Sequence, residues 1–190
     1  MRIGLISDTH MRYEESDTAL LPAIFDAFSG VDCILHAGDI YALWVLDRLE
    51  EIAPVYGVQA YPDLPDRRLA FRKQVLNLGG LRVGLVHNLG FPETGIDTDH
   101  VDRGLTFPPA LGVQGALNKF FGENLDVVVF GDTHEEFVGT YDGVLFVNPG
   151  SPTYPGIKHE LNSPGTVALL EINGSQAEAR VVQLPEPATK

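Results

Sequence analysis

The N-terminal part of the chain alternates short apolar runs with amphipathic stretches, and this alternation restricts the fold more than any other feature. The apolar runs Ile3–Ser7, Cys33–His36 and Pro54–Val58 have the length of buried strands. Between them, Thr18–Phe28 and Ala42–Ile52 space their apolar residues at helical intervals. This order predicts three parallel strands joined by right-handed helical crossovers.

Tight-turn sequences recur in the second half of the chain, and each indicates a β-hairpin. They are Gly79-Gly80 between Lys73–Leu78 and Leu81–His87, Tyr141-Asp142-Gly143 before Val144–Val147, and Asn173-Gly174 between Val167–Ile172 and Glu178–Leu184. A chain of 190 residues without internal repeats or a linker is typical of one domain. We therefore predict a single α/β domain over residues 1–190, in which two packed sheets are flanked by helices.

One long connection, Asn88–Gly115, interrupts this pattern. It is rich in Gly, Pro and Asp, and connections of this length inside a domain are usually functional or mobile. It contains no motif from which a substrate can be named. After it, the sequence predicts a helix at Ala116–Phe121 and a buried strand at Asp126–Phe130.

The composition excludes several classes of protein. Acidic residues outnumber basic ones by 26 to 13, which gives a net charge of −13 and argues against binding to nucleic acid. No apolar stretch reaches the roughly 18 residues that a membrane helix needs. The single cysteine, Cys33, lies in an apolar run and cannot form an internal disulfide. We expect a soluble cytoplasmic protein without membrane contacts, and a homodimer is the default for an oligomer.

Aspartate and histidine residues follow four of the predicted strands. They are Asp8 and His10 after the first strand, Asp39 after the second, His87 at the end of a hairpin strand, and Asp132 and His134 after Asp126–Phe130. Any one of them has an ordinary explanation as a helix cap or turn residue. Ligands bind beyond the carboxyl ends of strands in such sheets, so the four together predict one shared site.

Carboxylates mixed with neutral imidazoles suit Mn²⁺, Fe or Zn²⁺ better than Ca²⁺ or Mg²⁺. Two such ions about 3.5–4 Å apart can clamp a phosphoryl group. Asp39 is the best candidate to bridge two ions, because one carboxylate offers two oxygens. Glycines at positions 38 and 131 allow sharp turns beside the site.

Five short motifs have the order and spacing of a known family. They are SDTH at Ser7–His10, LHAGD at Leu35–Asp39, LVHN at Leu85–Asn88, GDTH at Gly131–His134 and NPGSP at Asn148–Pro152. In these motifs the chain resembles the calcineurin-like metallophosphoesterases, in particular their small bacterial and archaeal phosphodiesterase branch. The resemblance implies a four-layer α/β/β/α sandwich of two mixed sheets flanked by helices. It also implies hydrolysis of a small phosphoester by a metal-bound hydroxide at two divalent ions, which can be Mn, Fe, Zn or Ni, with Mn favoured.

Carried over by position, the family pattern assigns Asp8, His10, Asp39 and His134 to the first ion. The second ion shares Asp39 and adds His87, the residue at position 132 and an asparagine. This chain departs from the pattern at the second ion. The G-N-x-D motif of the family aligns with Ala60-Tyr61-Pro62-Asp63, so Tyr61 replaces the asparagine and Pro62 replaces the catalytic histidine or cysteine. In addition, Asp132 replaces a histidine, and H-G-H becomes His87-Asn88-Leu89.

These departures leave several interpretations open. In one, Asp132 binds the second ion through oxygen, and water, Asn88 or a loop residue (Asp97, Asp99, His100 or Asp102) completes its coordination. In another, the second ion is lost and the chain is a noncatalytic interaction scaffold, as the retromer subunit of this fold is. A third is a hydrolase with a single metal ion. Because all four ligands of the first ion are present, the enzyme is favoured.

Several further residues are expected to support the ligands or to contact substrate. His36, Tyr61, Asp63 and Asn88 are the candidates for these roles. Asn148 and Ser151 are expected to shape the turn near the ions. Lys158 and His159 are predicted to be surface residues, with contact to a phosphate as the alternative. No general acid is evident, because Pro62 stands where the family has a titratable group.

Overall fold

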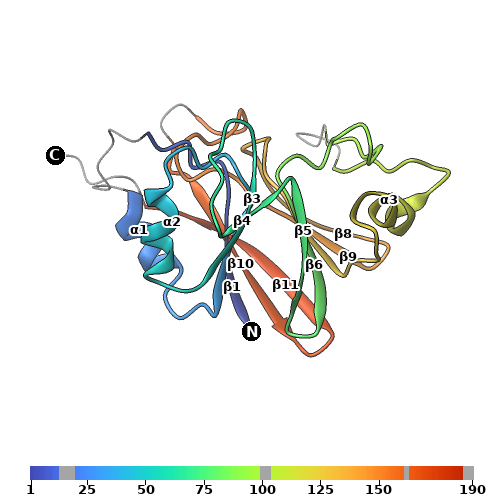
Figure 1. The fold of residues 1–190 in the computed structure, drawn as a ribbon, viewed down its shortest axis with the longest axis horizontal. Helices are drawn as coiled ribbons and strands as arrows, with labels where there is room; N and C mark the ends of the chain where they lie inside the picture. The colour runs from blue at the N-terminus through green and yellow to red at the C-terminus, as the bar shows by residue number, and fades with distance from the viewer. Residues whose placement is uncertain (13–19, 99–103, 161–162, 186–190) are drawn as a thin grey trace.

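Two β-sheets pack face to face, with helices on the outer side of each (Figure 1). The computed structural model describes residues 1–12, 20–98, 104–160 and 163–185. The first described sheet has six strands in the spatial order β11-β10-β1-β2-β3-β4. These strands are β1 (Arg2–Ile6), β2 (Cys33–His36), β3 (Val55–Gln59), β4 (Leu69–Phe71), β10 (Thr166–Asn173) and β11 (Gln176–Gln183).

Strands β1, β2 and β3 run parallel to one another, as the alternation of the sequence predicts. The connecting helices are α1 (Leu20–Ala27) and α2 (Trp44–Glu50), and α2 is shorter at both ends than the predicted Ala42–Ile52. The residues beside α2 form turns instead: the Val45 amide donates to the Ala42 carbonyl and the Ile52 amide to the Leu49 carbonyl, each three residues back. Of the predicted first helix, residues 18–19 lie outside the described residues.

Strand β4 is a parallel neighbour of β3 that the sequence analysis did not predict. At three residues it is too short to show a readable alternation. The residue before it, Arg68, has a buried guanidinium that pairs with Asp66 at 2.7 Å and with Asp47 at 2.8 Å. The pair with Asp47 ties β4 to α2 and helps to fix the edge of the sheet.

The second described sheet has five strands in the order β5-β6-β7-β9-β8. They are β5 (Lys73–Leu78), β6 (Leu81–Val86), β7 (Val127–Val129), β8 (Glu136–Tyr141) and β9 (Val144–Pro149). The predicted hairpins are present, because β5 pairs antiparallel with β6 and β8 with β9. Helix α3 (Gly112–Phe121) begins earlier than the predicted Ala116, since burial of Val113 outweighs the poor helix propensity of Gly112 and Gly115.

Three hydrophobic clusters fill the spaces between the layers. The central one lies between the sheets and takes Ile3 and Leu5 from β1, Val83 and Leu85 from β6, and Cys33 from β2. A second cluster packs α1 and α2 on the first sheet, and a third packs α3 on the second. The fold is therefore an α/β/β/α sandwich of two mixed sheets, as expected.

The outer face of β1 shows how closely these layers approach. Gly4 lies between Ile3 and Leu5 and points toward α1, where a Cβ would lie 2.9 Å from the ring of Phe28. Any larger residue there would displace this fully buried ring. None of the helices in the described part of the chain is both long and apolar enough to cross a bilayer.

The layered arrangement brings the carboxyl ends of β1, β2, β6 and β7 to one edge of the molecule. Several hydrogen bonds join the sheets at this edge, and two of them link the loops that carry candidate ligands. The Asp132 amide donates to Asp8 Oδ1 at 3.2 Å, and His87 Nδ1 donates to the Ala37 carbonyl at 2.8 Å. The loops after these four strands carry the candidate ligands.

Candidate metal centre

The backbone of the candidate ligands adopts an unusual conformation. Positive φ angles are rare for residues other than glycine, and strained conformations of this kind concentrate at functional sites. Five of the six candidate ligands have them: Asp8 (53°), His10 (46°), Asp39 (55°), Asp132 (74°) and His134 (60°). The surrounding structure must therefore hold these loops in place.

Asp63 holds the loop after β2. Its carboxylate accepts hydrogen bonds from the amides of Asp39 (2.9 Å), Ile40 (2.7 Å) and Tyr41 (3.0 Å), and from the Ala60 amide (2.9 Å). The Asp63 side chain thus fixes the position of Asp39 without joining the candidate ligands. The sequence analysis singled out Asp63 but could not assign it this role, because its partners come from a separate segment.

Ser151 and Thr153 hold the loop after β1. Ser151 Oγ donates to the Asp8 carbonyl at 2.7 Å and accepts from the Tyr154 amide at 2.9 Å. Thr153 Oγ1 donates to the Thr9 carbonyl at 2.8 Å. The NPGSP segment therefore supports the backbone of Asp8 from the second sheet.

Asn148 supports the loop after β7 in the same way. Its Nδ2 donates to the Gly131 carbonyl at 3.0 Å and to Thr133 Oγ1 at 3.0 Å. A Cβ on Gly131 would overlap Ser7 Oγ and lie 2.8 Å from Asp8 Oδ2, so only glycine lets this loop come so close to β1.

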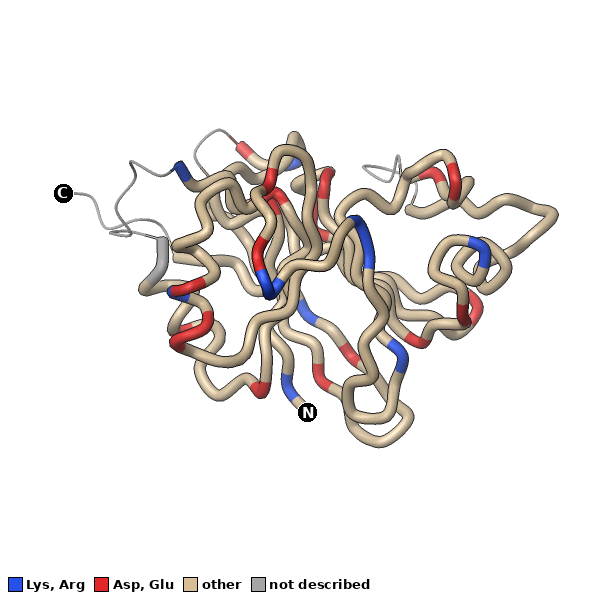
Figure 2. The backbone as a smooth tube through the Cα atoms, in the orientation of Figure 1, with Lys and Arg blue, Asp and Glu red and all other residues tan. Residues whose placement is uncertain are grey.

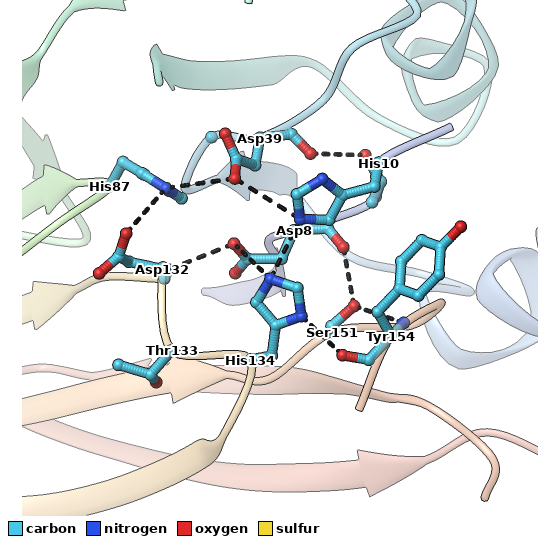
Figure 3. A network of polar contacts seen from close by, with 12 residues as sticks. Asp8, His10, Asp39, His87, Asp132, Thr133, His134, Ser151 and Tyr154 are labelled. Carbon is cyan, nitrogen blue, oxygen red and sulfur yellow. Dashed lines mark hydrogen bonds and ion pairs between the residues drawn. The ribbon is translucent and has the colours of Figure 1, made fainter. Parts of the chain in front are cut away.

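Six candidate ligands from the two sheets converge at this edge (Figure 3). On one side lie Asp8, His10 and His134, which we call the first group. His10 Nε2 and His134 Nε2 are 3.1 Å apart, and His134 Nε2 is 3.7 Å from Asp8 Oδ1. Two ring nitrogens and a buried carboxylate therefore face the same small volume.

On the other side lie Asp8, Asp39 and His87, which we call the second group. His87 Nε2 is 3.6 Å from Asp39 Oδ2 and 3.6 Å from Asp132 Oδ1. Asp39 Oδ2 is also 3.5 Å from His10 Nε2, so Asp39 faces both groups. Asp8 belongs to both groups as well. These two carboxylates are placed where bridging ligands would be needed.

The orientation of two histidines follows from their outer hydrogen bonds. His87 Nδ1 donates to the Ala37 carbonyl at 2.8 Å, and His134 Nδ1 donates to the Tyr154 carbonyl at 2.7 Å. A carbonyl can only accept, so the proton of each neutral ring lies on Nδ1. The lone pair of Nε2 then points at the carboxylates, which is the arrangement of a metal-binding histidine.

Burial shifts the pKa values of the cluster in a consistent way. Desolvation raises the pKa of Asp39 to about 6 and also raises the pKa of Asp8. Desolvation, together with the neighbouring His134 and His87, lowers the pKa of His10 to about 4. Both carboxylates therefore resist ionisation in this environment unless a compensating charge is present, whereas the imidazole of His10 stays neutral.

Two buried carboxylate oxygens indicate what that compensating charge is. Among the described residues, Asp8 Oδ2 and Asp39 Oδ1 have no hydrogen-bond partner. Such atoms are costly to bury without a donor or a cation. Carboxylate oxygens with imidazole nitrogens form the ligand set of borderline divalent metals, so these residues fit such ions.

The remaining candidates have different positions. The fully buried His36 accepts from the Gly38 amide at Nδ1 (3.2 Å) and donates from Nε2 to Thr9 Oγ1 (3.3 Å), so it supports the two loops. Tyr61 is 97% exposed, which rules it out as a replacement for the asparagine ligand. Asn88 is half-buried, with its Oδ1 beside Gly90. Asp132 reaches the second group with a side chain that is 41% exposed.

The loop candidates do not complete the second group in the described residues. Asp97 is exposed, and its backbone pairs with Thr106. Asp99, His100 and Asp102 lie outside the described residues.

Lys158 and His159 belong to another cluster. His159 Nε2 contacts Glu136 Oε2 at 2.7 Å, and the Lys158 amide donates to Glu135 Oε1 at 3.0 Å. These contacts anchor the segment after Tyr154 to the start of β8. They account for His159 without a phosphate.

Two cavities flank the candidate ligands. One, of about 470 Å³, has His87 in its wall together with Gln59, Tyr61, Phe71, Arg72 and Phe91. The other, of about 400 Å³, is lined by His10, Arg12, Tyr41, His134 and Tyr154. Sequence reasoning missed most of these aromatic residues, because no local pattern relates them to the ligands.

Comparisons with known proteins agree with this geometry. Residues 1–175 match the model of the calcineurin-like phosphoesterase superfamily domain. A protein named "Probable metallophosphoesterase" from Methanothermobacter thermautotrophicus is 32% identical over 192 residues, which cover 100% of this chain and 96% of that protein.

Solved structures share the fold at lower identity. Wild-type Vps29 from Entamoeba histolytica, complexed with Zn²⁺, is 22% identical with a TM-score of 0.62, covering 96% of this chain and 99% of that one. A novel archaeal phosphodiesterase is 19% identical with a TM-score of 0.61, covering 96% of this chain and 100% of that one. Taken with the sequence matches, this chain belongs to the calcineurin-like phosphoesterase superfamily.

Proposed function

We propose that this protein is a metal-dependent phosphodiesterase that acts on a small phosphoester with two divalent ions. The observation that carries the proposal is the position of Asp8 and Asp39 between two sets of imidazole nitrogens, each with a buried oxygen that lacks a partner among the described residues. Membership of the superfamily supports the reaction class.

The residues divide between the two ions as follows. Asp8, His10, Asp39 and His134 would hold the first, and Asp8, Asp39, His87 and Asp132 the second, so that both ions share the two carboxylates of Asp8 and Asp39. When bound, the ions would activate a water molecule and neutralise charge on the phosphoryl oxygens. We propose Mn²⁺ as the preferred metal, because Asp132 replaces a nitrogen ligand of the family pattern by oxygen.

The chain itself orients the ligands and supplies little acid catalysis. The carbonyls of Ala37 and Tyr154 keep the protons of His87 and His134 on Nδ1, away from the cluster. Pro62 carries no proton to donate to a leaving group. We therefore expect the enzyme to favour diesters whose leaving group is stable as an anion, such as a nitrophenolate.

Two features favour a diester over a monoester. One cavity adjoins the second group, with His87 in its wall, and the other adjoins the first group, with His10 and His134 in its wall. Each of the two ester groups of a diester could therefore occupy a separate cavity. The net charge of −13 also disfavours a dianionic monoester relative to a monoanionic diester. Figure 2 shows acidic residues on α2 and in loops around both sheets.

A second candidate function, an interaction scaffold, is favoured by the likeness to Vps29 and by the substitutions at Tyr61 and Asp132. The two functions differ in what they need from the cluster. An interaction scaffold would still bind its partner after its ions are removed, whereas a phosphodiesterase would lose its catalytic activity.

The test compares hydrolysis of bis(4-nitrophenyl) phosphate with that of 4-nitrophenyl phosphate by protein supplied with Mn²⁺. We expect metal-dependent cleavage of the diester, faster than cleavage of the monoester, and ~2 bound metal equivalents by elemental analysis. Asp39→Asn should abolish cleavage, while Asp142→Asn should not. Asp142 is a matched control because it also has a positive φ, 47°, but lies in the β8–β9 turn. Absence of cleavage in the loaded protein, or equal rates for Asp39→Asn and the parent, would refute the proposal.

A further inference from the structure

The cavity beside His87 differs in character from the metal-binding cluster that it adjoins. Its volume is about 470 Å³, and its walls come from the end of β3, the β4–β5 junction and the loop after β6. His87 lines it with the same side chain whose Nε2 faces Asp39 and Asp132. A group bound there would therefore lie beside the second group of candidate ligands.

Flat side chains form much of this wall. The Arg72 guanidinium carbon lies 4.4 Å from the centroid of the Phe91 ring, and Arg72 Nη2 contacts Glu93 Oε1 at 3.3 Å. These two contacts preorganise a planar cation against a planar ring. Arg72 also has a φ of 65°, an unusual backbone conformation for a long side chain and one that is found at ligand-binding sites.

Two aromatic rings at the rim of the cavity are open to solvent. Phe71 is 79% exposed and Tyr61 is 97% exposed, although both lie in the wall of a cavity next to the candidate ligands. Single exposed apolar residues are ordinary, but two exposed rings at the mouth of one cavity favour a ligand that stacks on them.

We propose that this cavity binds a planar aromatic ring carried by one ester group of the substrate, as found in a nucleoside or an aryl ester. Stacking on Phe71 and on the Arg72–Phe91 pair would select a flat π-system over an aliphatic chain of similar volume. The inference rests on the proposed phosphodiesterase function, since it places the phosphoryl group of that substrate at the cluster.

Charge limits the size of this substrate. Of the described residues that line the cavity, Arg72 alone is a lysine or arginine, and Glu93 pairs with it. A nucleic-acid strand would need several cationic contacts along its backbone. The cavity therefore fits one nucleoside or aryl group on a small diester, and a polymer is not expected to bind.

The test measures binding of inert ligands to the Mn²⁺-loaded protein by calorimetry, so that leaving-group reactivity plays no part. The ligands are methylphosphonate, phenylphosphonate and the non-hydrolysable phosphonate analogue of the nucleotide adenosine 5′-monophosphate. We expect phenylphosphonate to bind about tenfold more tightly than methylphosphonate, the size of one stacking contact. The nucleotide arm identifies the source of the ring: a nucleoside site binds it more tightly than phenylphosphonate, and an aryl site binds it more weakly.

Variants of the wall then assign the preference to named residues. Phe71→Ala and Arg72→Ala should each reduce the ratio of the two phosphonate affinities several-fold. Phe71→Leu should reduce it nearly as much, because leucine keeps apolar area but loses the flat ring. Tyr56→Leu is the matched control, since Tyr56 is 40% exposed and lies outside the cavity wall.

The outcomes separate this inference from the proposed function. Equal affinities for the two phosphonates, in a protein that hydrolyses bis(4-nitrophenyl) phosphate, would overturn the aromatic site alone. A preference that survives Phe71→Ala and Arg72→Ala would also overturn it. Failure to bind any phosphonate or to cleave the diester would overturn both proposals.

Discussion

The two groups of the candidate metal centre differ in how they are built. The first group, Asp8, His10 and His134, lies among loops anchored by Ser151 and Thr153, and the neighbouring Asp39 completes the set that the family pattern assigns to the first ion. The second group shares Asp8 and takes its other members from Asp39 and His87, with the half-exposed Asp132 nearby. The groups also differ in their surroundings, because His87 of the second lines the cavity with Phe71, Arg72 and Phe91, whereas His10 and His134 of the first line the cavity with Tyr41 and Tyr154. We infer from this difference that the first group secures the metal ion. The residues around the second group would then determine which substrate binds.

The strongest test of this comparison removes the residue that both groups share. Asp8→Asn should lower diesterase activity by about 10²–10³-fold, because one buried charge is lost from the binding of both ions. Steady-state kinetics in excess Mn²⁺, with elemental analysis of the same protein, measures this. If activity fell while two ions stayed bound, Asp8 would not be a shared ligand.

A smaller change should convert the second group toward the family pattern. Asp132→His supplies the nitrogen that GHTH has and GDTH lacks. We expect Zn²⁺ affinity at the second position to rise by about tenfold, and Mn²⁺ affinity to rise less, because imidazole suits zinc. Competition titration with a chromogenic chelator gives both values. Unchanged affinity for both metals would mean that position 132 does not contact the second ion.

Lowering the pH should release the two ions one after the other. The pKa of Asp39 is raised to about 6, so protons compete with the second ion as the pH falls below that value. The pKa of His10 is lowered to about 4, so this ligand of the first ion stays neutral until the pH is much lower. Burial also raises the pKa of Asp8, which both groups share, so acid weakens the binding of both ions. We expect the second ion, which is held mainly by carboxylates, to be lost first, with affinity falling about tenfold per pH unit below 6. Metal content after dialysis at stepped pH would show it, and simultaneous loss of both ions would contradict the assignment.

The smallest expected effect concerns the support of the first group. Ser151→Ala removes the donor to the Asp8 carbonyl and the acceptor of the Tyr154 amide, inside a fully buried site. It should lower the free energy of unfolding by about 1–2 kcal/mol. Urea denaturation of the metal-free protein measures this, with the exposed Ser175→Ala as the control. A loss as small as that of the control would show that the Ser151 hydroxyl does not stabilise the loop.

Much of this architecture could be predicted from local sequence. The parallel strands β1 to β3 and the hairpins follow from short-range periodicity and turn residues, and the motifs at their ends locate the candidate ligands. Strand β4 could not be predicted, because three residues show no period and the ion pair between Arg68 and Asp47 that holds it joins segments far apart in the sequence.

The parts of the site that escaped prediction depend on contacts between remote segments. Asp63 lies within a recognisable motif, yet its partners are amides of Asp39, Ile40 and Tyr41, which only the folded chain places around it. Phe71, Arg72 and Phe91 meet because β4, β5 and the loop after β6 are neighbours in space. Alternating apolar and polar residues carry no information about such encounters.

One feature has a mechanical meaning: the candidate ligands come from both sheets. Asp8, His10 and Asp39 follow strands of the first sheet, whereas His87, Asp132 and His134 follow strands of the second. An ion held by members of each set would cross-link the two sheets of the sandwich. Because the ion binds only the native state, its binding free energy would add to the free energy needed to separate the two sheets. Losing the ion would then loosen the whole sandwich along the seam where its two halves meet.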